Sequence, residues 1–392
     1  MGQKEIQLNG IKTSQFGDQL RVEAEVEGIE PLWFELEVEY QHLIDTESVD
    51  AFFLLYTWLA MESGIDLIVD GKVSQRLAQA LTGKVKEMFL ILCPRLKDIK
   101  IRVHNPCEDW HQDTLGCATG FSGGVDSWFT ALKSIEKGDP FQGYLFTNTG
   151  QHGEHNVSEI FIARAKVARE ISHTLEKPLI TVNSNIDHVF TERFQQRHSI
   201  SNLSCALLLQ RGFSEYSYAA GFTVKDSAIV PHTDMAVMDS FLLPLLATER
   251  MSFISCGDEA GRIEKLDYLS KFKQFNGQLY VCIEKSMPVR NCGTCFKCRR
   301  TQMALYSLGL TEVLAHSFDL EQFNKIKTLS MIGLMASGKT NISDFEIVDV
   351  LNRKYGKKIL HIRLMSQIWS FIKKNLPGSL KWRSMAKAPY LW

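Results

Sequence analysis

The chain has 392 residues, of which 45% are hydrophobic and 23% charged, and this length and composition suit a folded protein of about two or three domains. No apolar run reaches the roughly 18 residues needed to span a bilayer. The first ten residues, MGQKEIQLNG, also lack the apolar core of a signal peptide. Membrane-spanning and secreted classes are therefore excluded, and we expect a cytoplasmic protein that does not bind a membrane.

The formal net charge of −1 conceals a strongly basic C-terminal segment. From residue 353 to the end there are ten Lys or Arg residues and no Asp or Glu, which leaves 34 basic against 45 acidic residues elsewhere, a balance of −11. Such a segment meets either a polyanion such as nucleic acid or an acidic surface of its own or a partner chain. We favour the acidic surface, and with it a homo-oligomer or a protein partner, because the interleaved apolar residues resemble buried helix faces: Ile359, Leu360, Ile362, Leu364, Ile368 and Trp369.

Residues 1–114 are predicted to form an N-terminal α+β domain. Residues 19–28 and 32–40 alternate in polarity like two antiparallel strands, with Gly28 to Pro31 in the turn between them. Helices are expected over residues 49–63 and 73–90, and a closing strand over residues 99–106. Because no catalytic motif occurs in this region, we expect it to serve recognition.

Residues 115–310 alternate between strand-like and helix-like segments. Strands are expected over residues 117–121, 143–149 and 177–185, with helices over 125–138 and 159–175 between them, and further short strands over 216–222 and 252–257. This alternation predicts an α/β domain with a doubly wound parallel sheet, whose ligands bind at the carboxyl ends of its strands. A basic, mostly helical extension over residues 311–392 should follow.

The junction between the first strand and helix of this domain is rich in glycine and hydroxyl groups. Its sequence is Ser122-Gly123-Gly124-Val125-Asp126-Ser127. Bare backbone N–H groups in such a turn can wrap a phosphate, and the two serines add hydroxyl donors. The carboxylate of Asp126 suits a hydrated Mg²⁺ ion. An ordinary glycine turn with a serine cap is the simpler alternative.

These six residues match the SGGxDS signature of the PP-loop ATP pyrophosphatases. The resemblance implies a Rossmann-like fold in which the loop holds the β- and γ-phosphates of ATP. The α-phosphate is then attacked, AMP is transferred to a carbonyl or carboxylate oxygen, and pyrophosphate is released. Relatives hold the adenosine at the end of the second strand, which here is Phe146 and Thr147. Because the family includes amide-forming, nitrile-forming and tRNA-thiolating members, the loop indicates the activation step and not the product.

Four of the nine cysteines lie close together in the sequence, in the pattern C-x9-C-x2-C-x2-C: Cys282, Cys292, Cys295 and Cys298. In a reducing compartment such clustering favours a metal over disulfides, and two residues between cysteines let neighbouring thiolates bind one ion. We predict a Zn²⁺ tetrathiolate, whose negative charge is offset by the nearby Arg290, Lys297, Arg299 and Arg300. An iron–sulfur cluster also fits four thiolates, and buried free cysteines are the third reading.

The loop and the later four-cysteine cluster together resemble the 7-cyano-7-deazaguanine synthase family over residues 115–310, about half of the chain. The resemblance implies a structural zinc and an ATP-activated carboxylate, that of 7-carboxy-7-deazaguanine, which ammonia attacks. This sequence departs from the family in about 110 additional residues before the loop domain and about 80 after it. The family's usual substrate-contact stretch is not recognisable either.

Two polar stretches between the loop and the cysteines are candidates for binding a second substrate. The first, residues 230–240, carries His232, Asp234 and Asp239. We expect a structural role for His232 ahead of general acid–base work. The second has Asp258 as an expected helix cap. It also places Arg262 and Lys265 on one helix face, where their charge suits a carboxylate or an acyl-adenylate. A solvated face with an Asp258–Arg262 pair is the alternative.

Residues 333–340, GLMASGKT, match the pattern of a Walker A loop. A genuine loop of this kind needs a preceding strand, a long following helix and a further strand that carries an aspartate for magnesium. Only 52 residues remain after residue 340, and residues 341–344 resemble a turn with a helix cap. We therefore exclude a second nucleotide site there.

The sequence thus predicts an ATP-dependent ligase that forms a carbon–nitrogen bond. It would adenylate a small-molecule carboxylate, release pyrophosphate and pass the acyl group to ammonia or to a protein amine. We predict the protein amine, because the regions outside the loop domain carry no catalytic constellation and suit recognition. Catalytic roles are expected for Ser122, Asp126, Arg262 and Lys265. The alternatives are a tRNA sulfurtransferase, which would carry sulfur on its cysteines, and a zinc-bearing binding module with an inactive loop.

Overall fold

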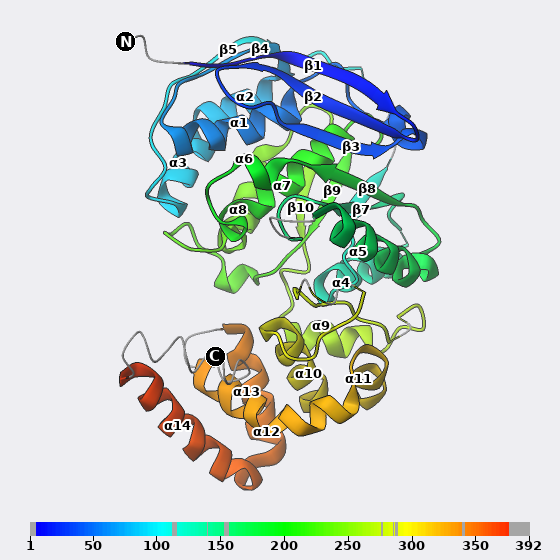
Figure 1. Ribbon diagram of the computed structural model, residues 1–392, viewed down its shortest axis with the longest axis vertical. Helices are drawn as coiled ribbons and strands as arrows, with labels where there is room; N and C mark the ends of the chain where they lie inside the picture. The colour runs from blue at the N-terminus through cyan, green and yellow to red at the C-terminus, as the bar shows by residue number, and fades with distance from the viewer. Residues whose placement is uncertain are drawn as a thin grey trace. The chain divides into compact units, whose positions relative to one another are not determined.

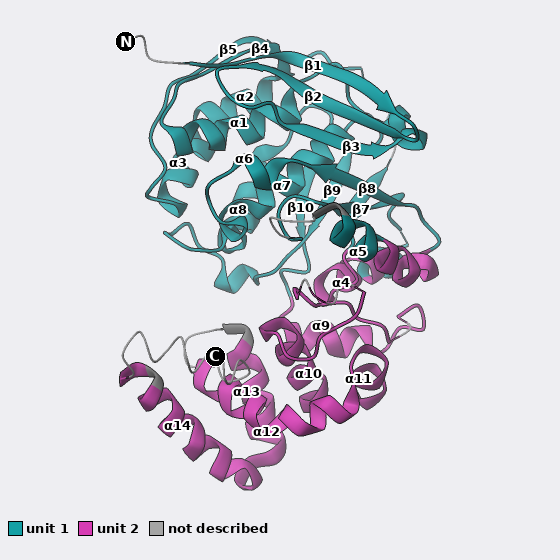
Figure 2. Cartoon of the chain, viewed as in Figure 1, with its two compact units in different colours: residues 1–121, 133–165, 176–259 teal, residues 122–132, 166–175, 260–392 magenta. Residues whose placement is uncertain are grey.

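The computed structural model describes residues 5–111, 116–138, 140–152, 157–275, 277–284, 286, 289–338 and 342–375. The chain divides into two compact units (Figure 2). Unit 1 comprises residues 1–121, 133–165 and 176–259, and unit 2 comprises residues 122–132, 166–175 and 260–392. These units do not follow the boundaries at residues 114/115 and 310/311 that the sequence suggested.

Unit 1 contains a ten-stranded mixed sheet, in which the strand order is β10-β9-β6-β7-β8-β3-β2-β1-β4-β5. Strands β6 to β10 run parallel to one another, and β6 lies in the middle of these five. The predicted α/β class is therefore confirmed, and the strand order is compatible with a Rossmann-like fold. The strands are β1 (Ile6–Phe16), β2 (Gln19–Glu27), β3 (Trp33–Glu37), β4 (Leu67–Ser74), β5 (Ile101–Cys107), β6 (Cys117–Gly120), β7 (Gly143–Thr147), β8 (Leu179–Ser184), β9 (Glu215–Ala219) and β10 (Ser252–Cys256).

The N-terminal strands extend the same sheet, because β3 pairs antiparallel with β8 through Phe34 and Ser184. The predicted antiparallel pair is confirmed as β2 and β3. Helix α1 (Asp50–Ser63) is buried around almost its whole circumference. It belongs to one apolar core that also includes residues of α7 (Phe194–Leu208). Residues 5–111 and the parallel strands are thus held together by a shared sheet and a shared core (Figure 1).

The helix predicted over residues 73–90 is wrong in its boundaries. Val73 and Ser74 end strand β4, and two helices follow, α2 (Gln75–Thr82) and α3 (Lys84–Leu92), with Gly83 between them. The side chain of Ser74 accepts a hydrogen bond from the N–H of Leu77 and so caps α2. The helix therefore begins at Gln75, two residues later than predicted. Strand β4 itself was missed.

The remaining helices of unit 1 are short apart from α7. Helices α4 (Val125–Glu136) and α5 (Val157–Ser172) contribute residues to both units, whereas α6 (Ile186–Val189) and α8 (Asp239–Leu242) belong to unit 1. Unit 2 is otherwise built from α9 (Arg262–Leu269), α10 (Phe296–Leu308), α11 (Thr311–Ser317), α12 (Leu320–Ser337), α13 (Ile342–Tyr355) and α14 (Leu360–Asn375). Among the residues described, no helix combines the length and apolar character needed to cross a membrane.

The segment that matches a Walker A loop is helical over most of its length. Residues 333–337 lie inside α12, which ends at Ser337, so the backbone there is not the open loop that a phosphate requires. Residues 339–341 lie outside the described part of the chain. The described part of this segment is therefore helix rather than loop.

The basic C-terminal helix, α14, presents an apolar face to solvent. Ile359 and Ile362 are buried as expected, but the side chains of Leu360, Leu364 and Ile368 are 61%, 59% and 52% exposed. The prediction that these three belong to a buried face is wrong. They recur every four residues and form one stripe, while Ile362 lies on a different side of the helix. Residues 376–392 lie outside the described part.

Candidate functional site

The glycine-rich loop lies between β6 and α4, as the sequence predicted. Gly123 has a φ of +73°, a conformation that side chains rarely adopt, and an added Cβ would lie 3.2 Å from Ile171 Cδ1. The Ser127 hydroxyl donates to the carbonyl of Gly124 at 3.0 Å and lies 3.4 Å from the backbone nitrogen of Ser122. The loop therefore requires glycine at position 123 and is closed by its own serine.

Asp126, in the first turn of α4, contacts two cations from α9. Its Oδ1 lies 2.9 Å from Lys265 Nζ and its Oδ2 lies 3.2 Å from Arg262 Nη2. The side chain of Lys265 is only 3% exposed, while those of Asp126 and Arg262 are 27% and 20% exposed. Three residues that the sequence singled out separately thus form one cluster in unit 2.

Charge explains the protonation state of Asp126. Burial disfavours its ionised form, but the charges of Lys265 and Arg262 outweigh burial and lower its pKa to about 2, with a smaller contribution from Lys297. Asp126 is therefore ionised at neutral pH. Arg262 also lies within range of a second carboxylate, that of Glu346, which accepts a hydrogen bond from the N–H of Ile263 at 3.4 Å.

A segment that precedes the first clustered cysteine runs along the loop. The backbone N–H of Tyr280 donates to the carbonyl of Gly123 at 2.8 Å, and the Trp128 indole donates to the carbonyl of Gln278 at 3.1 Å. Trp128 also packs edge-on against Phe275, with ring centroids 5.4 Å apart. Phe275, Gln278 and Tyr280 consequently hold both the loop and the start of α4.

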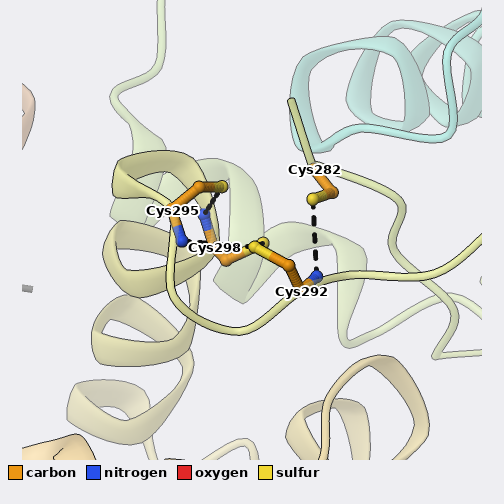
Figure 3. A group of neighbouring side chains, drawn as sticks. All are labelled: Cys282, Cys292, Cys295 and Cys298. Atoms are coloured by element: carbon orange, nitrogen blue, oxygen red, sulfur yellow. Dashed lines mark hydrogen bonds between the residues drawn. The ribbon is translucent and has the colours of Figure 1, made fainter. Parts of the chain in front are cut away.

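The four clustered cysteines form a compact group two residues further along (Figure 3). The sulfur atoms of Cys282, Cys292, Cys295 and Cys298 all lie within 4.8 Å of one another, and those of Cys292 and Cys298 are 4.0 Å apart. A tetrahedral zinc site with Zn–S bonds of about 2.3 Å separates its sulfurs by about 3.8 Å. The arrangement fits one metal ion, and the predicted set of four ligands is brought together.

The backbone around these sulfurs has the geometry of a metal-binding knuckle. The N–H groups of Cys295 and Cys298 point at the sulfurs of Cys292 and Cys295, at 3.2 and 3.5 Å, and Gly293 allows the turn with a φ of +73°. The N–H of Glu284 donates to Cys282 Sγ at 3.3 Å. Without a metal, hydrogen bonds among the four thiols lower the pKa of Cys292 and Cys295, that of Cys295 to about 6, and raise the pKa of Cys282 and Cys298. Donors directed at sulfur stabilise thiolates, which are the form that binds metal.

Other predicted residues occupy different positions. Phe146, near the end of β7 in unit 1, is buried and stacks on Phe161 with centroids 5.6 Å apart. The hydroxyl of Thr147 donates to Asn202 Oδ1 at 2.8 Å. The prediction that Asp258 caps α9 is wrong. Gly261 is the N-cap, and the Glu264 carboxylate in the first turn of α9 accepts the Gly261 N–H at 2.9 Å.

His232 and Asp234, from the first polar stretch, meet residues that sequence reasoning missed. Nδ1 of His232 lies 3.0 Å from the backbone nitrogen of Asp234, so this histidine shapes a local turn. The Asp234 carboxylate lies 3.0 Å from Nε2 of His198, whose Nδ1 lies 2.9 Å from the hydroxyl of Tyr218. A lone histidine on a helix gives no sequence signal, and only the packing of α7 against β9 and the following loop assembles the group.

Comparisons with protein-family models, with curated proteins and with solved structures find no match to this chain.

Proposed function

We propose that the protein is an ATP-dependent ligase that adenylates a carboxylate and transfers the acyl group to an amine. The observation that carries the proposal is the cluster of Asp126, which belongs to the Ser122–Ser127 loop and to the first turn of α4, with Arg262 and Lys265 of α9. A loop of this composition with two cations in contact suits a polyphosphate, and those cations also suit the acid that is activated.

The proposed reaction begins when a carboxylate oxygen of the acid attacks the α-phosphorus of ATP. The bond from that phosphorus to the bridging oxygen breaks, and pyrophosphate leaves with the electron pair. The charges of Lys265 and Arg262 stabilise negative charge that develops on the phosphates. Because Lys265 is almost fully buried, its charge is poorly screened by water and acts at close range. The amine then attacks the acyl carbon of the adenylate, AMP leaves, and the nitrogen loses a proton.

Asp126 has two proposed roles. It holds the ammonium of Lys265 and the guanidinium of Arg262 in place before ATP binds. It is also the acidic side chain of the loop that fits Mg²⁺, since magnesium in nucleotide sites uses one or two carboxylates together with substrate phosphates. When bound, Mg²⁺ would neutralise phosphate charge.

We propose that Zn²⁺ occupies the four-cysteine centre and has a structural role. Cys282 follows Tyr280 by two residues, and Tyr280 is hydrogen-bonded to the loop at Gly123. Lys297, between Cys295 and Cys298 on the knuckle, acts on the charge of Asp126. A metal that fixes the knuckle would therefore keep both the loop and its charges in place. Because all four sulfurs suit one ion, this arrangement gives no support to a sulfur-carrying role.

The proposed acyl acceptor is a protein amine on an acidic partner. Lys357, Lys358 and Arg363 are close in the sequence to the exposed stripe of Leu360, Leu364 and Ile368, and Arg353 and Lys354 end the preceding helix, α13. An acidic surface with apolar residues complements this face in charge and in polarity. Ammonia as the acceptor and an interface between copies of this chain are the alternatives.

The direct test is product analysis after incubation with ATP, Mg²⁺ and 7-carboxy-7-deazaguanine or related acids. We expect AMP and pyrophosphate, and we expect Asp126→Ala to lower the rate at least 100-fold. Asp267→Ala serves as the matched control, because Asp267 lies on α9 in an exposed pair with Lys271. Formation of ADP and phosphate without AMP, in the wild-type protein, would refute adenylation.

A further inference from the structure

Helix α10 carries a buried glutamine, Gln302, one turn after the last of the four clustered cysteines. Gln302 and Cys298 are both 0% exposed. Residues four apart on a helix lie on the same face, and side chains lean toward the N-terminus of the helix, so Gln302 leans toward Cys298. A Cβ added to Gly293 would lie 3.5 Å from Nε2 of Gln302. The amide therefore ends beside the knuckle that carries the metal ligands.

The amide group of Gln302 is an orphan in spite of its complete burial. Neither Oε1 nor Nε2 forms a hydrogen bond with any residue that the structure describes. A buried amide without a partner is costly and rare in folded proteins, and each such group calls for an explanation. Because this one lies beside a set of metal ligands, the centre itself is the nearest source of a partner.

Hydrogen-bond donors are distributed unevenly over the four sulfurs. The N–H groups of Cys295, Cys298 and Glu284 are directed at the sulfurs of Cys292, Cys295 and Cys282, respectively. In the described part of the chain, no N–H group is directed at the sulfur of Cys298, which lies 4.0 Å from that of Cys292. As a metal ligand, Cys298 is thus a fully buried thiolate that lacks a donor of its own.

The orphan donor and the thiolate without a donor complement each other. A glutamine amide offers two N–H groups, and hydrogen bonds to a charged acceptor are stronger than those between neutral groups. One N–H···S bond from Gln302 to Cys298 would satisfy both groups within a single turn of α10. Direct binding of the amide to the metal is less well suited, because four thiolates already complete a tetrahedron.

We propose that Gln302 is a positioning residue of the four-cysteine centre, and that its side-chain N–H donates a hydrogen bond to the thiolate of Cys298. The proposal rests on the proposed function for the presence of Zn²⁺ at the centre. The hydrogen bond orients one ligand and draws charge from its sulfur. A thiolate that shares its charge with a donor is a weaker nucleophile, so this bond suits a structural centre better than one that transfers sulfur.

The first test is the metal affinity of the full chain with Gln302→Met, which keeps the side-chain volume and removes both N–H groups. Competition with a chromophoric chelator gives the dissociation constant of Zn²⁺. We expect it to rise about 10- to 100-fold, as is typical when a partner of a metal ligand is lost. Ser307→Ala is the matched control and should keep the wild-type affinity. Ser307 is also buried on α10, but its hydroxyl donates to the carbonyl of Ala304 at 2.8 Å.

The absorption spectrum of the Co²⁺-loaded protein separates this role from a general loss of stability. The thiolate-to-cobalt charge-transfer band reports how readily sulfur gives up an electron. Without the N–H donor the sulfur gives it up more readily, so the band of Gln302→Met should move to longer wavelength. The d–d bands of tetrahedral cobalt should remain, and Ser307→Ala should keep the wild-type spectrum. A centre that is only destabilised would lose intensity while its band stays in place.

If Gln302→Met does not fold, wild-type protein loaded with ¹¹³Cd and labelled with ¹⁵N-glutamine replaces it. We expect a scalar coupling between ¹¹³Cd and a side-chain proton of Gln302, because such a coupling passes through a hydrogen bond to a bound sulfur. Absence of the coupling would overturn the proposal.

The outcomes distinguish the role of Gln302 from the proposals on which it rests. Wild-type protein that binds neither Zn²⁺ nor Co²⁺ would remove the metal centre and this role together. Tight binding by Gln302→Met, with an unshifted band, would keep the centre and remove only the role of Gln302. None of these measurements reads ATP cleavage, so a failure of adenylation leaves their result unchanged.

Discussion

Replacing Asp126 with Asn should destabilise unit 2 around the loop by about 2 to 4 kcal/mol. The pKa of Asp126 falls from 3.8 to about 2, a difference of roughly 1.8 units, which corresponds to about 2.5 kcal/mol at about 1.4 kcal/mol per unit. Because the pKa is lowered, this contribution is fully present above pH 4 and is lost as the pH falls through 2. The variant also removes the carboxylate that contacts the ammonium of Lys265, whose side chain is only 3% exposed.

The assay is native-state hydrogen exchange at pH 7.5, read from peptides over residues 122–132 and 262–269. Local exchange is chosen because a chain with two units need not unfold in one step. Asp267→Asn is the control, since Asp267 and Lys271 form an exposed pair at 2.7 Å whose removal should cost less than about 0.5 kcal/mol. If Asp126→Asn changes the protection of these peptides no more than the control does, the reasoning about a buried, charge-paired carboxylate is wrong.

Three further predictions concern the metal, a buried acid and the C-terminal helix. Elemental analysis should find one zinc per chain, and Cys298→Ser should lose it and expose unit 2 to proteolysis; iron with visible absorbance would contradict the assignment. Asp239→Asn should raise the urea midpoint at pH 8 by the equivalent of about 3 kcal/mol, because a pKa raised from 3.8 to about 6 penalises the folded state above pH 6. The gain in stability should vanish at pH 4, and an equal gain at both pH values would show that the ionised carboxylate of Asp239 is not its cause. Deletion of residues 353–392 should abolish labelling of a protein acceptor while AMP formation continues; label that enters only small molecules, at an undiminished rate, would exclude recognition by this segment.

Local sequence determined the elements whose signals are short-range. The glycines and serines of residues 122–127 predicted the turn between β6 and α4, because a φ of +73° at Gly123 is favourable only without a side chain. The spacing of Cys292, Cys295 and Cys298 predicted a shared ligand set, since two intervening residues bring neighbouring sulfurs together. The alternating strands and helices likewise predicted the α/β class, because periodicity depends only on neighbours in the chain.

The tertiary structure decided which distant residues meet. Asp126 and Lys265 are 139 positions apart, and nothing in either segment indicates that they pair. The same holds for Tyr218 and His198, and for the pairing of β3 with β8 that extends the sheet. The exposure of Leu360, Leu364 and Ile368 also escaped the sequence, because an amphipathic helix does not specify which of its apolar residues a neighbour covers. Such contacts depend on how whole elements pack, and that packing is a property of the complete chain rather than of any short stretch.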